Sequence, residues 1–136
     1  MATKRTPETI AHQKTQIIER MCEGESLRSI CKTAGFPTSG AVFHWIDADT
    51  DFARQYAHAR EAQADALFDD LAEIAQAALT SESAVEVAAR KLIIETTKWR
   101  ISKIVPKRYG DKLELAGDSK NPLSITVIER RIIDTA

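Results

Sequence analysis

Two long amphipathic stretches dominate the sequence and limit what the chain can fold into. Residues 50–79 and 84–105 are each predicted to form one helix, because apolar side chains recur at three- and four-residue intervals behind capping residues. A surface helix of a monomer usually buries one apolar stripe. The first stretch carries two adjacent stripes, which are Leu67, Leu71, Ile74 and Ala78, and then Phe68, Ala72, Ala75 and Leu79.

The second stretch repeats this excess of apolar surface. Its stripes are Val85, Ala88, Leu92 and Trp99 on one line and Val87, Ile94 and Ile101 on another. Two stripes on each helix exceed what a chain of 136 residues needs to bury by itself, so contact between subunits is predicted. The residues expected in that interface are Phe68, Leu71, Ile74, Leu79, Ile94, Trp99 and Ile101. The alternative is one hairpin thoroughly buried under the N-terminal helices.

Shorter helices are predicted ahead of these two. One begins with Thr6 as its cap and runs to about residue 21. A helix-turn-helix follows over residues 26–46, in which Gly35 ends the first helix. The predicted caps of its two helices are Ser26 and either Thr38 or Ser39. Its turn is longer than that of repressors, so the motif alone is also compatible with a packing unit that contacts no DNA.

As a DNA reader, this motif would place the N-terminal end of its second helix in the groove. The residues presented there would be Thr38, Ser39, Gly40, Ala41 and His44. They include no Arg or Asn for a bidentate base contact, which predicts low sequence specificity. Phosphate contacts are expected from the flanking cations Lys4, Arg5, Arg28 and Lys32. So few cations give weak binding per subunit, and many linked copies would strengthen it by avidity.

The C-terminal part has a different pattern. Residues 112–116 and 123–132 alternate with period two and are rich in β-branched residues, which predicts strands. Two strands alone are marginal in water, and pairing with strands of other subunits in a closed barrel would remove their open edges. The alternatives are a tail that folds back on its own helices or stays disordered.

The predicted fold is therefore mainly α, in three parts. These are a helix-turn-helix DNA-binding domain over 1–50, central oligomerisation helices over 51–106 and a C-terminal β segment over 107–136 that forms an intersubunit barrel in a ring.

The charge is unevenly distributed along a nearly neutral chain. Lys and Arg number 19 and Asp and Glu number 20, a formal net charge of −1. Residues 51–80 hold two basic and six acidic groups, whereas residues 81–113 hold eight basic and four acidic groups. The acidic helix and the basic helix could complement each other within one chain or between chains. We expect no membrane span and no secretory signal, and the two cysteines suit a reduced, cytoplasmic protein.

No pattern in the sequence predicts catalysis. Asp65, Asp69 and Glu73 share a helix face near Asp70 and could hold Mg²⁺, but a solvated or ion-paired acidic face is far commoner. The histidines lack zinc-ligand spacing, and there is no phosphate-binding loop, so any ATP hydrolysis belongs to a partner. We therefore expect no catalytic residues, no metal and no cofactor.

Several segments are similar, in order and spacing, to the small terminase subunits of tailed bacteriophages, of the type found in short-tailed Shigella phages. They are "GESLRSICK", "PTSGAVFHWI", "DFARQYAHAREAQAD" and "KWRISKIVPKRYGDK", and the resemblance covers about residues 20–115. The chain departs from the family pattern at His44, where a basic residue is expected, and at Arg108 before Tyr109. Histidine gains charge only as pH falls, so groove binding at neutral pH would be weaker.

The resemblance implies a ring of roughly eight to ten copies that works in the host cell cytoplasm during infection. It further implies that the ring binds viral double-stranded DNA and presents it to the large terminase subunit, an ATPase and nuclease. Residues 26–46 would then bind DNA, 51–105 would form the ring, and 112–132 would form the barrel and dock the large subunit. The alternative function is a dimeric helix-turn-helix transcription regulator, which would be a two-fold dimer reading a palindrome. A scaffold without DNA contact is a third.

Overall fold

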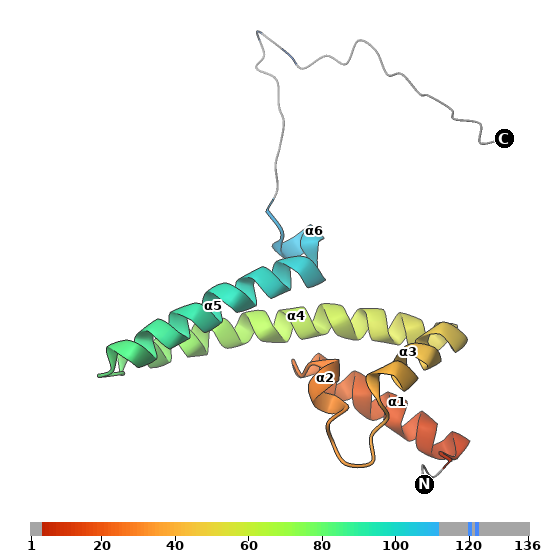
Figure 1. Ribbon diagram of the computed structural model, residues 1–136. Coiled ribbons are helices and arrows are strands. Elements are labelled where there is room, and N and C mark those ends of the chain that lie inside the picture. The colour runs from red at the N-terminus through yellow and green to blue at the C-terminus, as the bar shows by residue number, and fades with distance from the viewer. Residues whose placement is uncertain (1–3, 112–119, 121, 123–136) are drawn as a thin grey trace, which may run out of the picture.

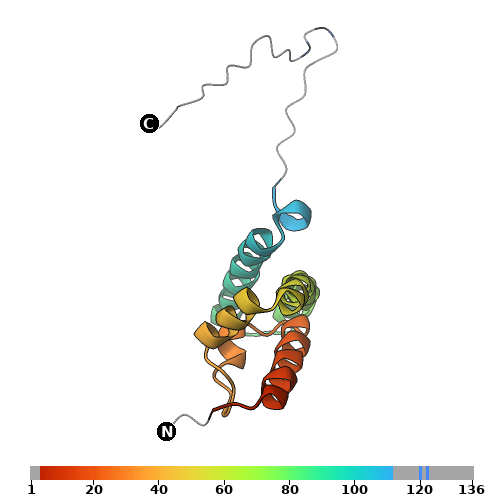
Figure 2. The same cartoon turned by 90° about the vertical axis from the view of Figure 1, so that its right-hand side faces the viewer.

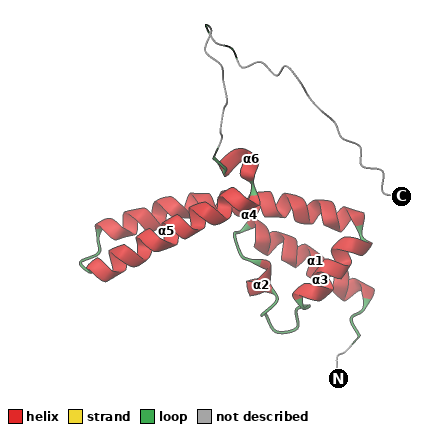
Figure 3. Ribbon diagram, turned by 45° about the horizontal axis from the view of Figure 1, so that its top comes forward, coloured by secondary structure: helices red, strands yellow, loops and turns green. Residues whose placement is uncertain are grey.

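The computed structural model describes residues 4–111, 120 and 122. Its helices are α1 (Pro7–Cys22), α2 (Leu27–Ile30), α3 (Ser39–Ala48), α4 (Thr50–Leu79), α5 (Ala84–Ile104) and α6 (Pro106–Tyr109). The described residues form helices and loops without a strand (Figure 3). The mainly α class is confirmed, and the strands predicted at 112–116 and 123–132 lie outside the described residues. Of the predicted β segment 107–136, the first residues are described, and they belong to helix α6.

The long helix α4 organises the molecule. Helices α1, α2 and α3 lie along its first half, and α5 returns antiparallel along its second half (Figure 1). A view turned by 90° shows that α1 and α5 pack against different sides of α4 (Figure 2). One helix therefore joins the N-terminal bundle to the hairpin.

Side-chain caps fix where the first three helices begin. The backbone N–H of Thr9 donates to Thr6 Oγ1 at 3.2 Å, and the N–H of Ser29 donates to Ser26 Oγ at 3.2 Å. The third helix is capped by Thr38, whose Oγ1 accepts from the N–H of Ala41 at 3.3 Å. Each cap satisfies a backbone donor that has no partner inside the helix. The caps predicted at Thr6 and Ser26 are confirmed.

The two long helices are capped as well. Asp49 Oδ1 accepts from the N–H groups of Asp51 and Phe52 at 3.0 and 3.1 Å, which starts α4. Ser83 Oγ accepts from the N–H of Glu86 at 3.3 Å, which starts α5. The carboxylate of Glu86 accepts hydrogen bonds from Ser81 and Arg90 and does not return to the Ser83 amide. Only half of the capping box suggested by this spacing forms.

Helix α2 is only four residues long. The loop 31–38 that follows is held in place by hydrogen bonds from side chains of the N-terminal segment and α1. Gly35 has the left-handed conformation expected of a helix terminator, with φ of 80°. Side chains of the N-terminal segment bind the loop: Arg5 Nη2 donates to the carbonyl of Phe36 at 3.0 Å, and Gln13 Nε2 donates to that of Gly35 at 2.8 Å. Arg20 Nη1 adds a hydrogen bond to Thr33 Oγ1 at 2.8 Å. These contacts supply partners that a longer helix would otherwise provide.

The N-terminal hydrophobic core extends into α4. Its buried members come from all four elements, and they are Ile17, Met21, Leu27, Ile30, Val42, Phe52 and Ala59. Phe52 and Ala59 belong to α4, so the predicted division at residue 50 falls inside this packing unit. Lys14 packs at the edge of this core. Its Nζ forms an ion pair with Asp49 Oδ2 at 2.8 Å and lies 5.2 Å from the centre of the Phe52 ring.

A second core lies between α4 and α5. Ala64, Ile101 and Val105 are buried there, with Leu67 and Leu71 packed against them. The prediction that Ile101 lies in a subunit interface is therefore wrong, because this side chain is 1% exposed and packs within its own chain. Three others are half-buried and line the same hairpin, and they are Leu71, Ile74 and Ile94. Phe68, Leu79 and Trp99 remain exposed.

Gln63 links the two cores at the middle of α4. Its side chain is fully buried. Its Nε2 donates to the carbonyl of Glu25, in the turn after α1, and its Oε1 accepts from Arg60 Nη1 at 2.7 Å. A buried amide is stable only when its polar atoms are paired, so this contact fixes the N-terminal bundle against α4.

We predict that Gln63→Ala lowers the free energy of unfolding by about 1–3 kcal/mol, because it leaves a carbonyl without its donor. Chemical denaturation measures the change. The control is Gln76→Ala on the same helix, where the side chain is exposed and the effect should be negligible. Equal losses in both variants would show that the buried hydrogen bonds of Gln63 add no stability of their own.

Candidate nucleic-acid and subunit interfaces

Helix α3 presents its N-terminal half to solvent. Val42 is buried and Trp45 and Ile46 pack against the core, as the helical periodicity predicted. The opposite face is exposed and contains Ser39, Gly40, Phe43, His44 and Asp47. Thr38, Ser39, Gly40 and His44 therefore share the accessible side of the motif, whereas Ala41 is half-buried.

The predicted cations do not all remain free to contact a ligand. Lys4, Arg28 and Lys32 are exposed, as a phosphate contact requires. Arg5 is also exposed, but its guanidinium is hydrogen-bonded to the carbonyl of Phe36 and so supports the turn. Helix α3 itself carries no Lys or Arg, so positive charge reaches this surface from the neighbouring elements.

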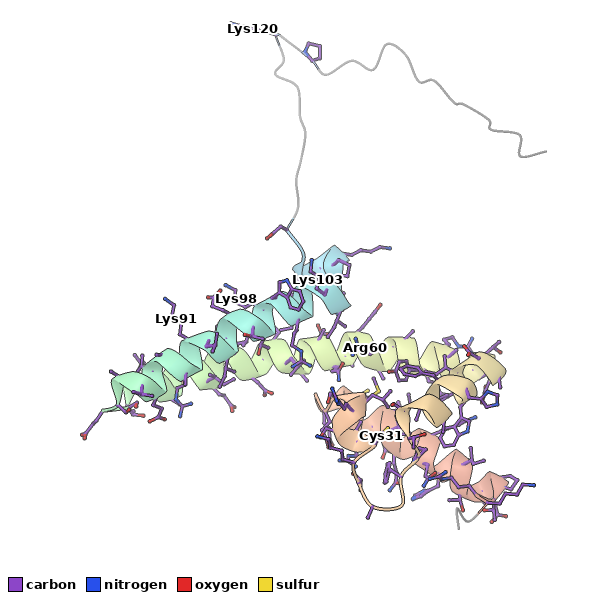
Figure 4. All side chains as sticks on the ribbon, viewed as in Figure 1. Cys31, Arg60, Lys91, Lys98, Lys103 and Lys120 are labelled. Atoms are coloured by element: carbon purple, nitrogen blue, oxygen red, sulfur yellow. The ribbon has the colours of Figure 1, made fainter. Side chains whose placement is uncertain are left out.

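A groove brings one further cation to this surface. Its lining residues come from α2 and its cap, α3 and α4, and they are Ser26, Leu27, Arg28, Ser39, Phe43, Tyr56 and Arg60. Arg28 and Arg60 thus lie at the same groove as Ser39, at the start of α3. Figure 4 marks Arg60 on α4.

Sequence reasoning missed Arg60 because α4 was assigned to oligomerisation alone. The signal was present, since Arg54 and Arg60 are the only cations in the acidic segment 51–80. Arg54 is paired with Asp51 on the helix surface, whereas Arg60 lines the helix-turn-helix groove and donates one hydrogen bond to Gln63 Oε1.

A second surface lies on the long hairpin. The stripe Leu67, Leu71, Ile74 and Ala78 is half-buried, and the stripe beside it, Phe68, Ala72, Ala75 and Leu79, is exposed. On α5, Ile94 and Ile101 face α4, while Val85, Leu92 and Trp99 are 80%, 68% and 62% exposed. Within the described chain, each long helix therefore has one stripe that is largely half-buried or buried, with Val87 as an exposed exception at 41%, and a second stripe that is uncovered.

Charged side chains accompany the uncovered stripes. On α5, Lys91, Lys98 and Lys103 are exposed, and they are labelled in Figure 4. Lys103 Nζ lies 5.8 Å from the ring centre of Trp99, a cation–π distance. On α4, the carboxylates of Asp69 and Glu73 are exposed.

Helix α6 is clasped to α4 through Asp65. The hydroxyl of Tyr109 donates to Asp65 Oδ1 at 2.6 Å, and Arg108 Nη2 donates to Asp65 Oδ2 at 3.0 Å. The Tyr109 ring also packs on Phe68 with 5.2 Å between centres. Both hydrogen bonds lower the pKa of Asp65, and the bond from Tyr109 has the larger effect. The hydrogen bond to Asp65 also raises the pKa of Tyr109.

This clasp changes the interpretation of the acidic cluster on α4. Asp65 serves as the partner of α6, which gives it a structural role in place of the metal-ligand role considered for this helix face. Within residues 4–111, no three His, Cys, Asp or Glu side chains are grouped as a metal site. In the same part of the chain, no helix is both long and apolar enough to cross a bilayer.

Comparison with known proteins identifies the relatives of this architecture. Residues 9–116 match the family described as "Bacteriophage Sf6, terminase small subunit-like". The chain belongs to this family. The resemblance to small terminase subunits seen in the sequence is thus confirmed for most of the chain.

Crystal structures of the terminase small subunit gp1 of the bacterial virus Sf6, each with a single substitution, are similar to this member of the terminase small subunit family. Three of them share 35% sequence identity with the chain at a TM-score of 0.69. Two matches cover 93% of this chain and 95% of gp1, and the third covers 92% and 98%. No match was found among curated proteins.

We predict that α6 detaches from α4 as the pH falls. Because the pKa of Asp65 is lowered in the folded chain, its contribution is present above the ordinary aspartate value of 3.8 and is lost progressively as the pH falls from there through the lowered pKa of the folded chain. Hydrogen exchange of the α6 amides between pH 6 and pH 3 measures the release. Asp65→Asn should exchange rapidly at every pH, whereas Asp70→Asn should behave as wild type; protection unchanged in Asp65→Asn would contradict the clasp.

Proposed function

We propose that this protein is a small terminase subunit that binds viral double-stranded DNA and presents it to the large terminase subunit for genome packaging. Family membership supports this role. The observation that carries the DNA-binding part is the groove in which Arg28 of α2 and Arg60 of α4 flank the start of α3. Phosphate contacts from two sides would orient the exposed α3 face toward the bases.

The chemistry of this surface determines what kind of DNA binding is expected. The exposed α3 side chains include no Lys, Arg, Asn or Gln, so they offer few base-specific hydrogen bonds. Binding by a single copy should be weak, salt-dependent and of low sequence specificity. A closed assembly that holds several copies on one DNA raises the effective concentration and compensates for the weak individual contacts.

The remaining parts of the proposal concern assembly and partners. The protein forms a homo-oligomeric ring of eight to ten copies in the host cell cytoplasm during infection, without a membrane or a cofactor. Its C-terminal strands form a barrel that docks the large subunit. The protein itself is not an enzyme, and ATP hydrolysis and DNA cleavage belong to the large subunit.

We predict that Arg28→Ala with Lys32→Ala weakens DNA binding and lowers the salt slope by about 2, because each lost phosphate contact removes about one unit. Adding Arg60→Ala should lower the slope by about one more. Gel-shift titrations at several salt concentrations measure both quantities.

The matched control is Arg54→Ala, which removes an arginine of the same helix that is paired with Asp51 outside the groove. It should bind DNA as wild type does. If Arg54→Ala weakens binding as much as Arg60→Ala does, overall charge rather than the groove accounts for the affinity.

A further inference from the structure

Phe43 is an aromatic side chain that the fold leaves in solvent. Its ring is 53% exposed, and it belongs to neither hydrophobic core of the described chain. Two other phenylalanines, Phe36 and Phe52, pack in the N-terminal core. The fourth, Phe68, packs its ring on Tyr109 of α6. Folding of the described residues therefore does not account for an aromatic ring at position 43.

The position of Phe43 on α3 brings its ring to the end of the helix that contacts bases in a helix-turn-helix. Helical side chains lean toward the N-terminus of their own helix, so the ring covers the turn that contains Ser39 and Gly40. Because serine is small and glycine has no side chain, Phe43 is the first bulky group on the exposed face of α3. Phe43 and Ser39 line the same groove, which agrees with this direction.

The charges around Phe43 favour an approach by DNA at this end of α3. Arg28 of α2 and Arg60 of α4 line the groove together with Phe43. Asp47, the acidic residue on the same exposed face, lies one turn further along the helix. Positive charge is thus concentrated where the ring is, and a phosphate backbone held by the two arginines would bring base edges against it.

Thymine is the base whose major-groove edge suits an apolar ring. Its C5-methyl group protrudes into the major groove, where the other three bases present hydrogen-bonding groups that a phenyl ring cannot pair. We propose that Phe43 reads thymine, by packing its ring on the C5-methyl groups of A·T pairs in the major groove. The inference rests on the proposed DNA binding and names the base that the motif prefers.

This contact gives a sequence preference of limited size without any base-specific hydrogen bond. Burying one methyl group in an apolar contact strengthens binding about fourfold. Several copies on one DNA molecule multiply this factor. A chain whose α3 carries no Arg or Asn can therefore still favour thymine-rich DNA.

Duplexes that differ only in methyl groups test this proposal. One duplex contains thymine, and the second has 2′-deoxyuridine in its place, which removes the C5-methyl groups and keeps every base pair. Fluorescence anisotropy titrations measure the affinity of the full-length protein for each. The wild-type chain should bind the thymine duplex more tightly, by about fourfold for each methyl group contacted. A G·C duplex with 5-methylcytosine should likewise bind more tightly than its unmethylated form.

Substitutions at position 43 connect this preference to the ring. Phe43→Ala should bind the thymine and deoxyuridine duplexes equally, because the methyl group has lost its apolar partner. Phe43→Leu keeps an apolar side chain and should keep the preference. The ring is exposed, so both variants should retain the wild-type melting curve.

Two further variants separate base reading from charge. Arg28→Ala should weaken binding to both duplexes by the same factor, because a phosphate contact carries no information about the base. The matched control is Asp47→Ala, which changes the same face of α3 one turn further on. It should keep the wild-type ratio of the two affinities.

Two results would overturn the role of Phe43 and leave the proposed function intact. In the first, the wild-type chain binds the thymine and deoxyuridine duplexes with equal, salt-dependent affinity. In the second, Phe43→Ala keeps the full wild-type preference, which would assign it to the shape of the DNA. A wild-type chain that binds neither duplex at low salt would instead refute the proposed DNA binding, and the inference with it.

Discussion

Helix α4 takes part in both hydrophobic cores of the described chain. Its first half completes the N-terminal core through Phe52 and Ala59, and its second half forms the hairpin core with Ile101 of α5. Gln63 stands between these regions and pairs its buried amide with the turn after α1 and with Arg60. Because one continuous helix contributes to both cores, the position of the groove at the start of α3 is fixed relative to the hairpin.

This arrangement connects the proposed DNA-binding surface with the proposed subunit interface. Arg60 contributes to the groove at the start of α3, and it lies on the same helix as the exposed stripe that ends at Leu79. Copies that associate through the hairpin would therefore hold their helix-turn-helix motifs at regular intervals. Weak phosphate contacts at each motif would then act together on one DNA molecule.

Local features of the fold could be predicted from the sequence, and features set by tertiary contacts could not. The caps at Thr6 and Ser26 depend on residues within one turn, and they were predictable for that reason. The short α2 was not, because its loop is held by Arg5, Gln13 and Arg20 from another part of the chain.

The same distinction applies to the candidate surfaces. The sequence predicted two stripes on each long helix, but periodicity alone could not say which stripe faces inward, so Ile101 was wrongly placed in the subunit interface. Arg60 at the groove and Asp65 at the α6 clasp both depend on contacts between distant segments. The family resemblance was recognisable because its motifs extend along most of the chain.

The central claim is that the long hairpin exposes more apolar surface than one copy can cover. The most direct test is sedimentation velocity of the full-length wild-type chain across a hundredfold range of concentration. The account predicts one closed species of many copies that keeps its sedimentation coefficient on dilution. A stable monomer at every concentration, with the faces of Leu92 and Trp99 protected from solvent within a single chain, would contradict it.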